Sequence, residues 1–259
     1  MAEYYSLWKS MMIEGAELSF WQEFFVKFYQ AFIENNRWTQ YLEGVGTTLV
    51  VTAMALAIGV VLGVIVAVVR TAHDQQRPGT GSLFGRLLLG VANFICKIYV
   101  TVIRGTPMMV QMLIMGLVIF KSSRNFTSIG ALTLGINSGA YVAEIIRGGL
   151  MSLDPGQAEA SRSLGLNYID TMWFVVIPQA FKAILPSLGN EFIILLKDTS
   201  LITVIGGKEL LDAAQGIYNR TFEQMFPLLG IAVMYLILVM VFSWLQGILE
   251  RRLRQSDRR

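Results

Sequence analysis

Long apolar runs separated by short polar connections dominate the hydrophobic pattern of this chain. Residues 45–69 carry no charge and stop at Arg70, which is enough to cross about 30 Å of hydrocarbon at about 1.5 Å per residue. Gly59 and Gly63 in this run either let another helix approach closely or are incidental. The other spans are expected at 128–146, 185–205, 226–249 and within 83–120. The pattern predicts an all-α integral membrane protein with about five transmembrane helices.

The run from 83 to 120 is less regular than the others, because polar residues interrupt it. Arg104 and Gly105 are followed by a threonine and Pro107, and this sequence should bend the chain. We therefore expect a sloped or interfacial lead-in before the bend and the second span after it.

Composition agrees with the membrane assignment. Of the 259 residues 54% are hydrophobic and only 15% are charged, whereas a soluble domain averages about 25% charged residues. The single cysteine, Cys96, excludes an intramolecular disulfide. The net charge of +3 is modest and the basic residues are dispersed, which argues for a role in topology and against a nucleic-acid partner.

The distribution of Lys and Arg predicts the orientation. With the N-terminus outside, the cytoplasmic connections hold eleven of these residues and the outer ones seven, and the basic tail 251–259 makes most of the difference. Basic residues are retained on the cytoplasmic side, so the count favours a multi-pass membrane protein with N outside and C inside. The transmembrane permease domain is expected at 42–250.

Residues 1–41 are predicted to form an amphipathic segment at the outer membrane surface. An aromatic stripe repeats every four residues, with Trp21 and Phe25 broadening it and charged residues on the remaining positions. The stripe consists of Phe20, Phe24, Phe28 and Phe32. These rings either lie on the membrane or pack against the first span, and neither alternative gives the segment a chemical task.

The connection 150–182, between the third and fourth spans, has its own helix signals. Asp154 is a natural N-cap, Pro155 fits the first helical position, and Gly165 is the residue type that closes a helix in the left-handed conformation. A second helix is expected at about 168–177, before Pro178. The segment therefore reads as a helix-turn-helix that presses into a groove on a partner, or as an ordinary helical loop.

A known motif resembles this segment. Glu159, Ala160 and Ser161 are followed after three residues by Gly165, and later by an isoleucine with Pro178. The spacing is similar to that of the EAA loop of permease subunits in bacterial ABC importers. Serine for the second alanine, and isoleucine for the commoner leucine before the proline, are small departures. The resemblance implies that an ATP-binding subunit docks here, on Gln157, Glu159, Ala160, Ser161, Gly165 and Pro178.

The resemblance extends over about residues 40–250 and is greatest to the polar amino-acid group, the histidine and glutamine permeases. The stretches that carry it include Arg104 to Pro107, Asn137 to Glu144 and Leu196 to Leu201. It implies the fold of a type I ABC importer permease, which pairs with a second permease copy or a paralogue. It also implies an extracytoplasmic binding protein that delivers a polar amino acid, and ATP and Mg²⁺ bound on the partner ATPase. The chain itself has no P-loop motif, so no cofactor is expected on it.

Polar residues within the predicted spans mark a possible substrate pathway. An ionisable group in hydrocarbon costs about 2.5–3.5 kcal/mol on insertion scales, so it is normally paired or lines a wet cavity. Glu144 and Arg147 lie one turn apart and can neutralise each other, while Lys197 and Asp198 should each find a partner on another helix. The alternative to substrate contact is ion pairing that holds the bundle together. The candidates are Asn137, Tyr141, Glu144, Lys197, Asp198, Thr199 and Ser200.

Other functions remain to be weighed. An ion-driven secondary transporter would be expected to show inverted repeats or paired broken helices, and neither is evident. A non-transporting membrane scaffold would not need charges inside its spans. An enzyme is disfavoured because the sequence has no nucleophile grouping and no metal-ligand cluster.

Overall fold

The computed structural model describes residues 1–75 and 82–256, with the side chains of 254–256 excepted. Throughout this part of the chain the regular elements are helices. As predicted, five of the described helices are long and apolar enough to cross a membrane: Trp38–Asp74, Leu83–Gly105, Phe126–Met151, Tyr168–Ile205 and Met225–Leu253. Three basic residues counted for the topology lie outside the described residues: Arg77, between the first two spans, and Arg258 and Arg259 of the basic tail. The structure does not address their predicted role in topology.

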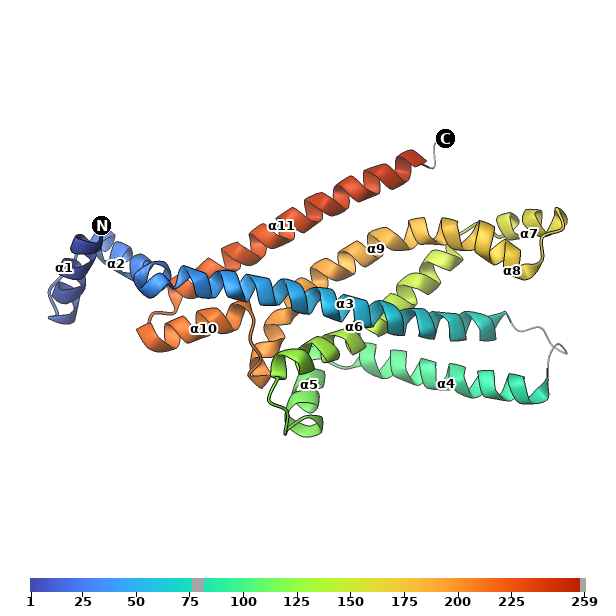
Figure 1. Cartoon of the computed structure of the whole chain (residues 1–259), viewed down its shortest axis with the longest axis horizontal. Helices are drawn as coiled ribbons and strands as arrows, with labels where there is room; N and C mark the ends of the chain where they lie inside the picture. The colour runs from blue at the N-terminus through green and yellow to red at the C-terminus, as the bar shows by residue number, and fades with distance from the viewer. Residues whose placement is uncertain (76–81, 257–259) are drawn as a thin grey trace.

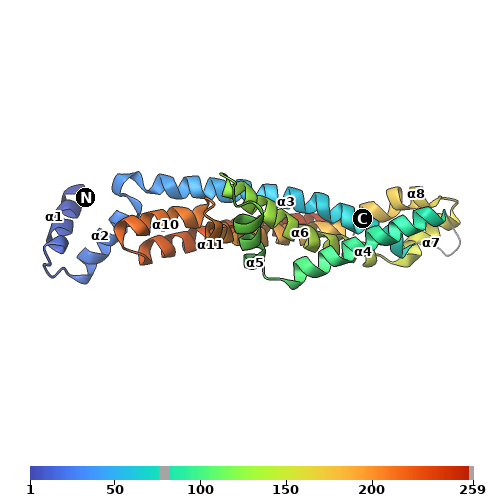
Figure 2. The same cartoon turned by 90° about the horizontal axis from the view of Figure 1, so that it is seen from below.

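The molecule is elongated, and the last helix, α11 (Met225–Ser256), runs along its long axis from near the N-terminal helices and stops short of the other end (Figure 1). Helices α1 (Ala2–Ile13) and α2 (Phe20–Phe32) are at one end, and α7 (Pro155–Ser163) and α8 (Tyr168–Thr171) are at the other. The view from below shows the same separation (Figure 2). The predicted docking segment and the N-terminal segment therefore lie at opposite ends of the molecule.

The N-terminal segment forms a hairpin of two helices, α1 and α2. The second of them, α2, is the helix that the aromatic stripe predicted. A reciprocal capping box between Ser19 and Gln22 begins α2. A short 3-10 turn, η1 (Glu34–Asn36), then leads into the first span, α3 (Trp38–Asp74). The alternative that the aromatic stripe packs against the first span holds for Phe32, whose ring centroid lies 5.4 Å from that of Tyr41 in α3, whereas Phe20 at the start of the stripe is exposed.

The second span lies before the bend, so the expectation that it follows Pro107 is wrong. Helix α4 (Leu83–Gly105) is the candidate span, whereas α5 (Met108–Leu113) and the π-helix η2 (Ile114–Ile119) form a shorter apolar segment. The bend itself is confirmed, because Thr106 is extended and α4 ends there. Polar residues do not exclude α4 from the bilayer, because Asn93 is buried within the protein and Arg104 contacts α6.

Helix α6 (Phe126–Met151) packs along α3 through small residues. A Cβ placed on Gly59 would lie 2.8 Å from the Ser138 Oγ, and one on Gly63 would lie 2.5 Å from Val142 Cγ1. Gly135 of α6 is equally close to Ile58 of α3. Gly59 and Gly63 are therefore not incidental, because they let the two helices approach at a distance that a side chain would prevent.

The fourth span is continuous with the second cytoplasmic helix, so the prediction that this helix ends before Pro178 is wrong. After α8 the chain runs through the π-helix η3 (Met172–Val176), α9 (Ile177–Asp198) and the 3-10 helix η4 (Thr199–Ile205). Ile177 donates to the carbonyl of Met172, five residues back. This wider turn lies immediately before Pro178 and accommodates a residue that has no N–H to donate.

The last two helices, α10 (Leu210–Thr221) and α11 (Met225–Ser256), complete the fold. Buried Glu209 is the N-cap of α10 and accepts hydrogen bonds from the backbone of Leu211 at 2.5 Å and from the Tyr235 hydroxyl at 2.5 Å. The oxygen that accepts from Tyr235 also accepts from the Thr48 hydroxyl of α3 at 3.4 Å. One carboxyl therefore joins α3, α10 and α11 near the end that carries the N-terminal hairpin.

Candidate functional site: coupling helix and polar seam

Helix α7 has the ends that its sequence predicted, and we call it the coupling helix. The Asp154 carboxylate accepts from the Gly156 backbone at 2.8 Å, with Pro155 at the start of the helix. Gly165 has φ +89°, the left-handed conformation that glycine adopts without strain. A helix of nine residues with a defined start and end is thus presented at the tip of the molecule.

The predicted docking residues divide between the surface and the interior. Glu159 and Ala160 are exposed, whereas Ser161 is buried and its hydroxyl contacts the Thr171 hydroxyl at 3.3 Å. Ser161 therefore fastens the coupling helix to the start of the fourth span. Gln157 and Pro178 also lie at the surface, and Gln157 accepts from the Gln179 amide at 3.4 Å.

Exposed apolar side chains adjoin the coupling helix. Leu164 is 85% exposed and Ile169 is 74% exposed, far more than a loop on an isolated monomer requires. A hollow of about 1020 Å³ opens beside them, lined by the ends of α3 and α6 and by the coupling helix. This end of the molecule has the surface of a protein-docking site.

A second group of polar side chains lies between α3, α4, α5 and α6. We call it the polar seam, and it consists of Arg70, Arg104, Gln111, Asn137, Glu144 and Arg147. Glu144 is its centre: it pairs with Arg70 of α3, with Arg104 of α4 at 3.7 Å, and with Arg147 one turn along α6 at 3.8 Å. The Arg104 guanidinium also lies over the Tyr141 ring, 5.2 Å from its centroid.

The predicted Glu144–Arg147 pair is present, but it is one of three contacts made by Glu144. In the sequence, Arg70 marks the end of the first apolar run and Arg104 belongs to the predicted bend. Each is an ion-pair partner of a carboxylate on another helix. Sequence spacing could not indicate these pairs, because Arg70 and Glu144 are 74 positions apart.

Gln111 is a seam residue that the sequence did not single out. Its amide donates to the Ile103 carbonyl at 2.7 Å and to the Thr106 hydroxyl at 2.8 Å, and thereby closes the bend formed by Arg104, Gly105 and Pro107. Its oxygen accepts from the Asn137 amide at 2.9 Å. The bend and the predicted pathway residue Asn137 are therefore physically joined.

The polar residues at the end of α9 are arranged differently from the expectation. Among the described residues neither Lys197 nor Asp198 has an ion-pair partner on another helix, so that prediction is wrong. Thr199 and Ser200 donate to backbone carbonyls and begin the 3-10 turn. Lys197 itself is exposed.

Glu191 is a further intramembrane acid that the sequence reading passed over. It is only 6% exposed, and the Ser138 hydroxyl of α6 donates to it at 2.7 Å. Its position inside an apolar run was the available signal, because an acid there needs a partner.

Comparison with known proteins decides what this architecture is. The family model described as binding-protein-dependent transport system inner membrane component matches residues 79–255. The chain belongs to this family. It is the permease subunit of an ABC importer, and the secondary transporter and the scaffold are not favoured.

Individual relatives agree with the family assignment. The glutamine transport system permease protein GlnP of Escherichia coli (strain K12) is 37% identical over 218 residues, which cover 82% of this chain and 92% of GlnP. The arginine transport system permease protein ArtQ of Bacillus subtilis (strain 168) is 33% identical over 221 residues, covering 83% of this chain and 93% of ArtQ.

Solved structures show the same fold. A chain from the crystal structure of an amino acid ABC transporter with histidines aligns with a TM-score of 0.73 at 38% identity, over 83% of this chain and 94% of that one. The inward-facing MetNI methionine ABC transporter aligns with a TM-score of 0.67 at 19% identity, covering 85% and 99% of the two chains, a likeness of fold alone. The all-helical permease fold predicted from the sequence is confirmed.

Proposed function

We propose that this permease imports polar amino acids, powered by ATP and Mg²⁺ bound on a separate ATP-binding subunit. The observation that carries the proposal is its 37% identity to GlnP over 92% of that glutamine permease. An extracytoplasmic binding protein delivers the amino acid, and a second permease, either a copy of this chain or a paralogue, completes the pathway.

The proposed orientation in the inner membrane is N outside and C inside. An odd number of spans requires the termini on opposite faces, and α11 carries the chain away from the end of the molecule that holds the N-terminal helices (Figure 1). The excess of basic residues on the C-terminal side supports the cytoplasmic placement of the coupling helix.

Uptake in reconstituted vesicles tests the substrate class. We expect the permease, purified with its ATPase and supplied with the binding protein, to accumulate glutamine, histidine or arginine only when ATP is present on the ATPase side. Accumulation that needs an ion gradient instead of ATP would contradict the mechanism. ATP-driven uptake of other solutes, with none of the amino acids carried, would contradict the substrate class alone.

The ATP-binding subunit is proposed to dock on the coupling helix. Support comes from the defined helix ends, the exposed Glu159 and Ala160, and the adjoining exposed Leu164. Ser161 and Gly165 then act by holding this surface in place: Ser161 is fastened to Thr171, and Gly165 turns the chain toward α8.

Lys197 is the proposed cation for the substrate carboxylate. The carboxylate of an amino-acid zwitterion needs a positive group that is not already neutralised, and Lys197 is exposed. The three arginines near the pathway, in contrast, are all paired with Glu144. Asn137, Tyr141, Asp198, Thr199 and Ser200 remain the proposed polar lining of the pathway, and Glu144 the charge that holds α3, α4 and α6 together around it.

Lys197→Met is expected to weaken substrate use by about ten- to a hundredfold, because a hydrogen bond between charged groups is worth about 1.5–3 kcal/mol. The loss should appear as a raised KM for ATP-driven uptake, since methionine retains the length of the stem without the charge. Lys97→Met is the matched control, because Lys97 is also an exposed cation inside a span. Equal kinetics for both variants would remove Lys197 from the pathway.

A further inference from the structure

The N-terminal hairpin carries an exposed aromatic surface that the transport mechanism does not use. The aromatic stripe is exposed along most of α2: Phe20 is 71% exposed, and Phe24 and Phe28 are 41% exposed. Trp21 beside it is 74% exposed, and neighbouring rings along the stripe contact one another at 5.3–6.4 Å. The family model begins at residue 79, so this surface lies outside the matched range.

The stripe continues directly into the surface of the last span. Phe24 and Phe28 contact Phe226 at the start of α11, with ring centroids 5.0 and 6.5 Å apart. Phe32 lies over Gly230, where an added Cβ would come within 2.5 Å of the Phe32 ring. Further along α11 the exposed apolar side chains are Leu229, Val233, Leu236, Ile237 and Met240. An exposed apolar face on a candidate span is suited to contact with lipid tails, and the stripe extends this face at one end of the bundle.

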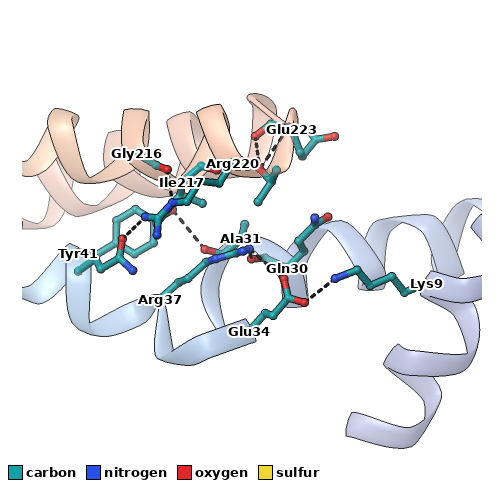
Figure 3. A network of polar contacts seen from close by, with 12 residues as sticks. Lys9, Gln30, Ala31, Glu34, Arg37, Tyr41, Gly216, Ile217, Arg220 and Glu223 are labelled. Atoms are coloured by element: carbon teal, nitrogen blue, oxygen red, sulfur yellow. Dashed lines mark hydrogen bonds and ion pairs between the residues drawn. The ribbon is translucent and has the colours of Figure 1, made fainter. Parts of the chain in front are cut away.

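Ion pairs hold the hairpin in this orientation. Lys27 bridges Glu23 of α2 at 2.8 Å and Glu223, just before α11, at 3.2 Å. Glu34 pairs with Lys9 of α1 at 2.5 Å and with Arg37 at 3.1 Å (Figure 3). Although burial opposes its ionisation, the Lys9 hydrogen bond and the nearby positive charges hold the pKa of Glu34 below its usual value.

Two further contacts fix the hairpin to the spans. Arg37 donates to the Gln30 carbonyl near the end of α2, and the Tyr41 hydroxyl of α3 donates to the Ala31 carbonyl of α2 at 3.4 Å (Figure 3). The exposed face of α2 is therefore presented in one direction instead of swinging on a flexible linker.

We propose that the hairpin rests with its aromatic stripe in the interfacial layer of the bilayer, on the face opposite the coupling helix, and so braces the start of α11. Aromatic side chains partition into this layer, where an amphipathic helix buries its apolar face. A lipid surface fits better than a soluble partner, because the stripe is continuous with the lipid-facing side of a span.

Fluorescence quenching in vesicles tests this placement in the complete chain. The background variant is Cys96→Ser, which removes the only cysteine of the sequence. A single cysteine is then introduced on the exposed face by Phe20→Cys or Trp21→Cys, and in the control by Asn219→Cys. Asn219 is exposed and polar on α10 at the same end of the molecule. Each single-cysteine variant is labelled with an environment-sensitive dye and reconstituted in phosphatidylethanolamine–phosphatidylglycerol vesicles.

The proposal predicts several-fold stronger quenching of the labels at 20 and 21 by lipids that carry a shallow nitroxide than of the label at 219. Aqueous iodide should quench in the reverse order. Two positions are used so that the result does not depend on one replaced ring. If iodide reaches positions 20 and 21 as readily as 219, the stripe faces water or a soluble partner and the proposal is overturned.

Discussion

Ala160→Arg is expected to abolish ATP-driven uptake while the permease remains folded. Ala160 is exposed on the coupling helix, so an arginine side chain at this position can extend away from the protein. At a docking surface, a bulky charge at the centre costs about 2 kcal/mol or more, which is about thirtyfold in affinity. The measurement is co-purification of the ATP-binding subunit from native membranes, together with ATP-driven uptake in vesicles.

Ala16→Arg is the matched control, because Ala16 is also exposed but lies between α1 and α2, at the opposite end of the molecule. It should retain both the ATPase and the uptake. If Ala160→Arg retains the ATPase as well as the control does, the coupling helix is not the docking site, whereas the fold and the family assignment would be unaffected.

Gly63→Leu should destabilise the protein by at least about 3 kcal/mol, near the upper end of overpacking costs. The obstacle is not only the Val142 side chain, because the added Cβ would also lie 2.9 Å from the backbone nitrogen of Ala143. Backbone cannot move aside by changing rotamer, so α3 and α6 must separate. Thermal unfolding of the purified permease in detergent measures the effect as a large fall in the unfolding temperature.

Gly46→Leu provides the comparison on the same helix, since nothing lies within 4 Å of a Cβ at Gly46. Both replacements lower the flexibility of the unfolded chain alike and add the same side chain. Similar unfolding temperatures for the two variants would show that the α3–α6 contact tolerates a side chain at Gly63, contrary to the packing described above.

The sequence predicted those features that depend on local chemistry. Apolar runs of sufficient length identified the spans, and the cap at Asp154 and the left-handed Gly165 defined the coupling helix. Prediction from the sequence failed where contacts between helices change the free-energy cost of placing a residue inside a span. Arg104 argued against α4 as a span until its pairing with Glu144 on α6 was known.

The candidate site shows the same division. The docking residues follow one another along the chain and were found together, but the seam is assembled from four helices. Gln111 has no charge and no motif, so nothing in the sequence distinguishes it from any other glutamine before the bend is built around it. Pro178 misled for a related reason, because proline ends a helix only where the preceding turn cannot widen.

The unbroken helix from Tyr168 to Ile205 has a mechanical consequence. Its 38 residues follow a continuous helical path of about 57 Å at about 1.5 Å per residue, which contains Pro186 and bends toward its far end (Figure 1). Ser161 fastens the coupling helix to one end of this path at Thr171, and Lys197 lies near the other. No loop interrupts the backbone between these two points. A displacement of the coupling helix is thus expected to reach the membrane interior along one continuous helical segment, without a relay of side chains.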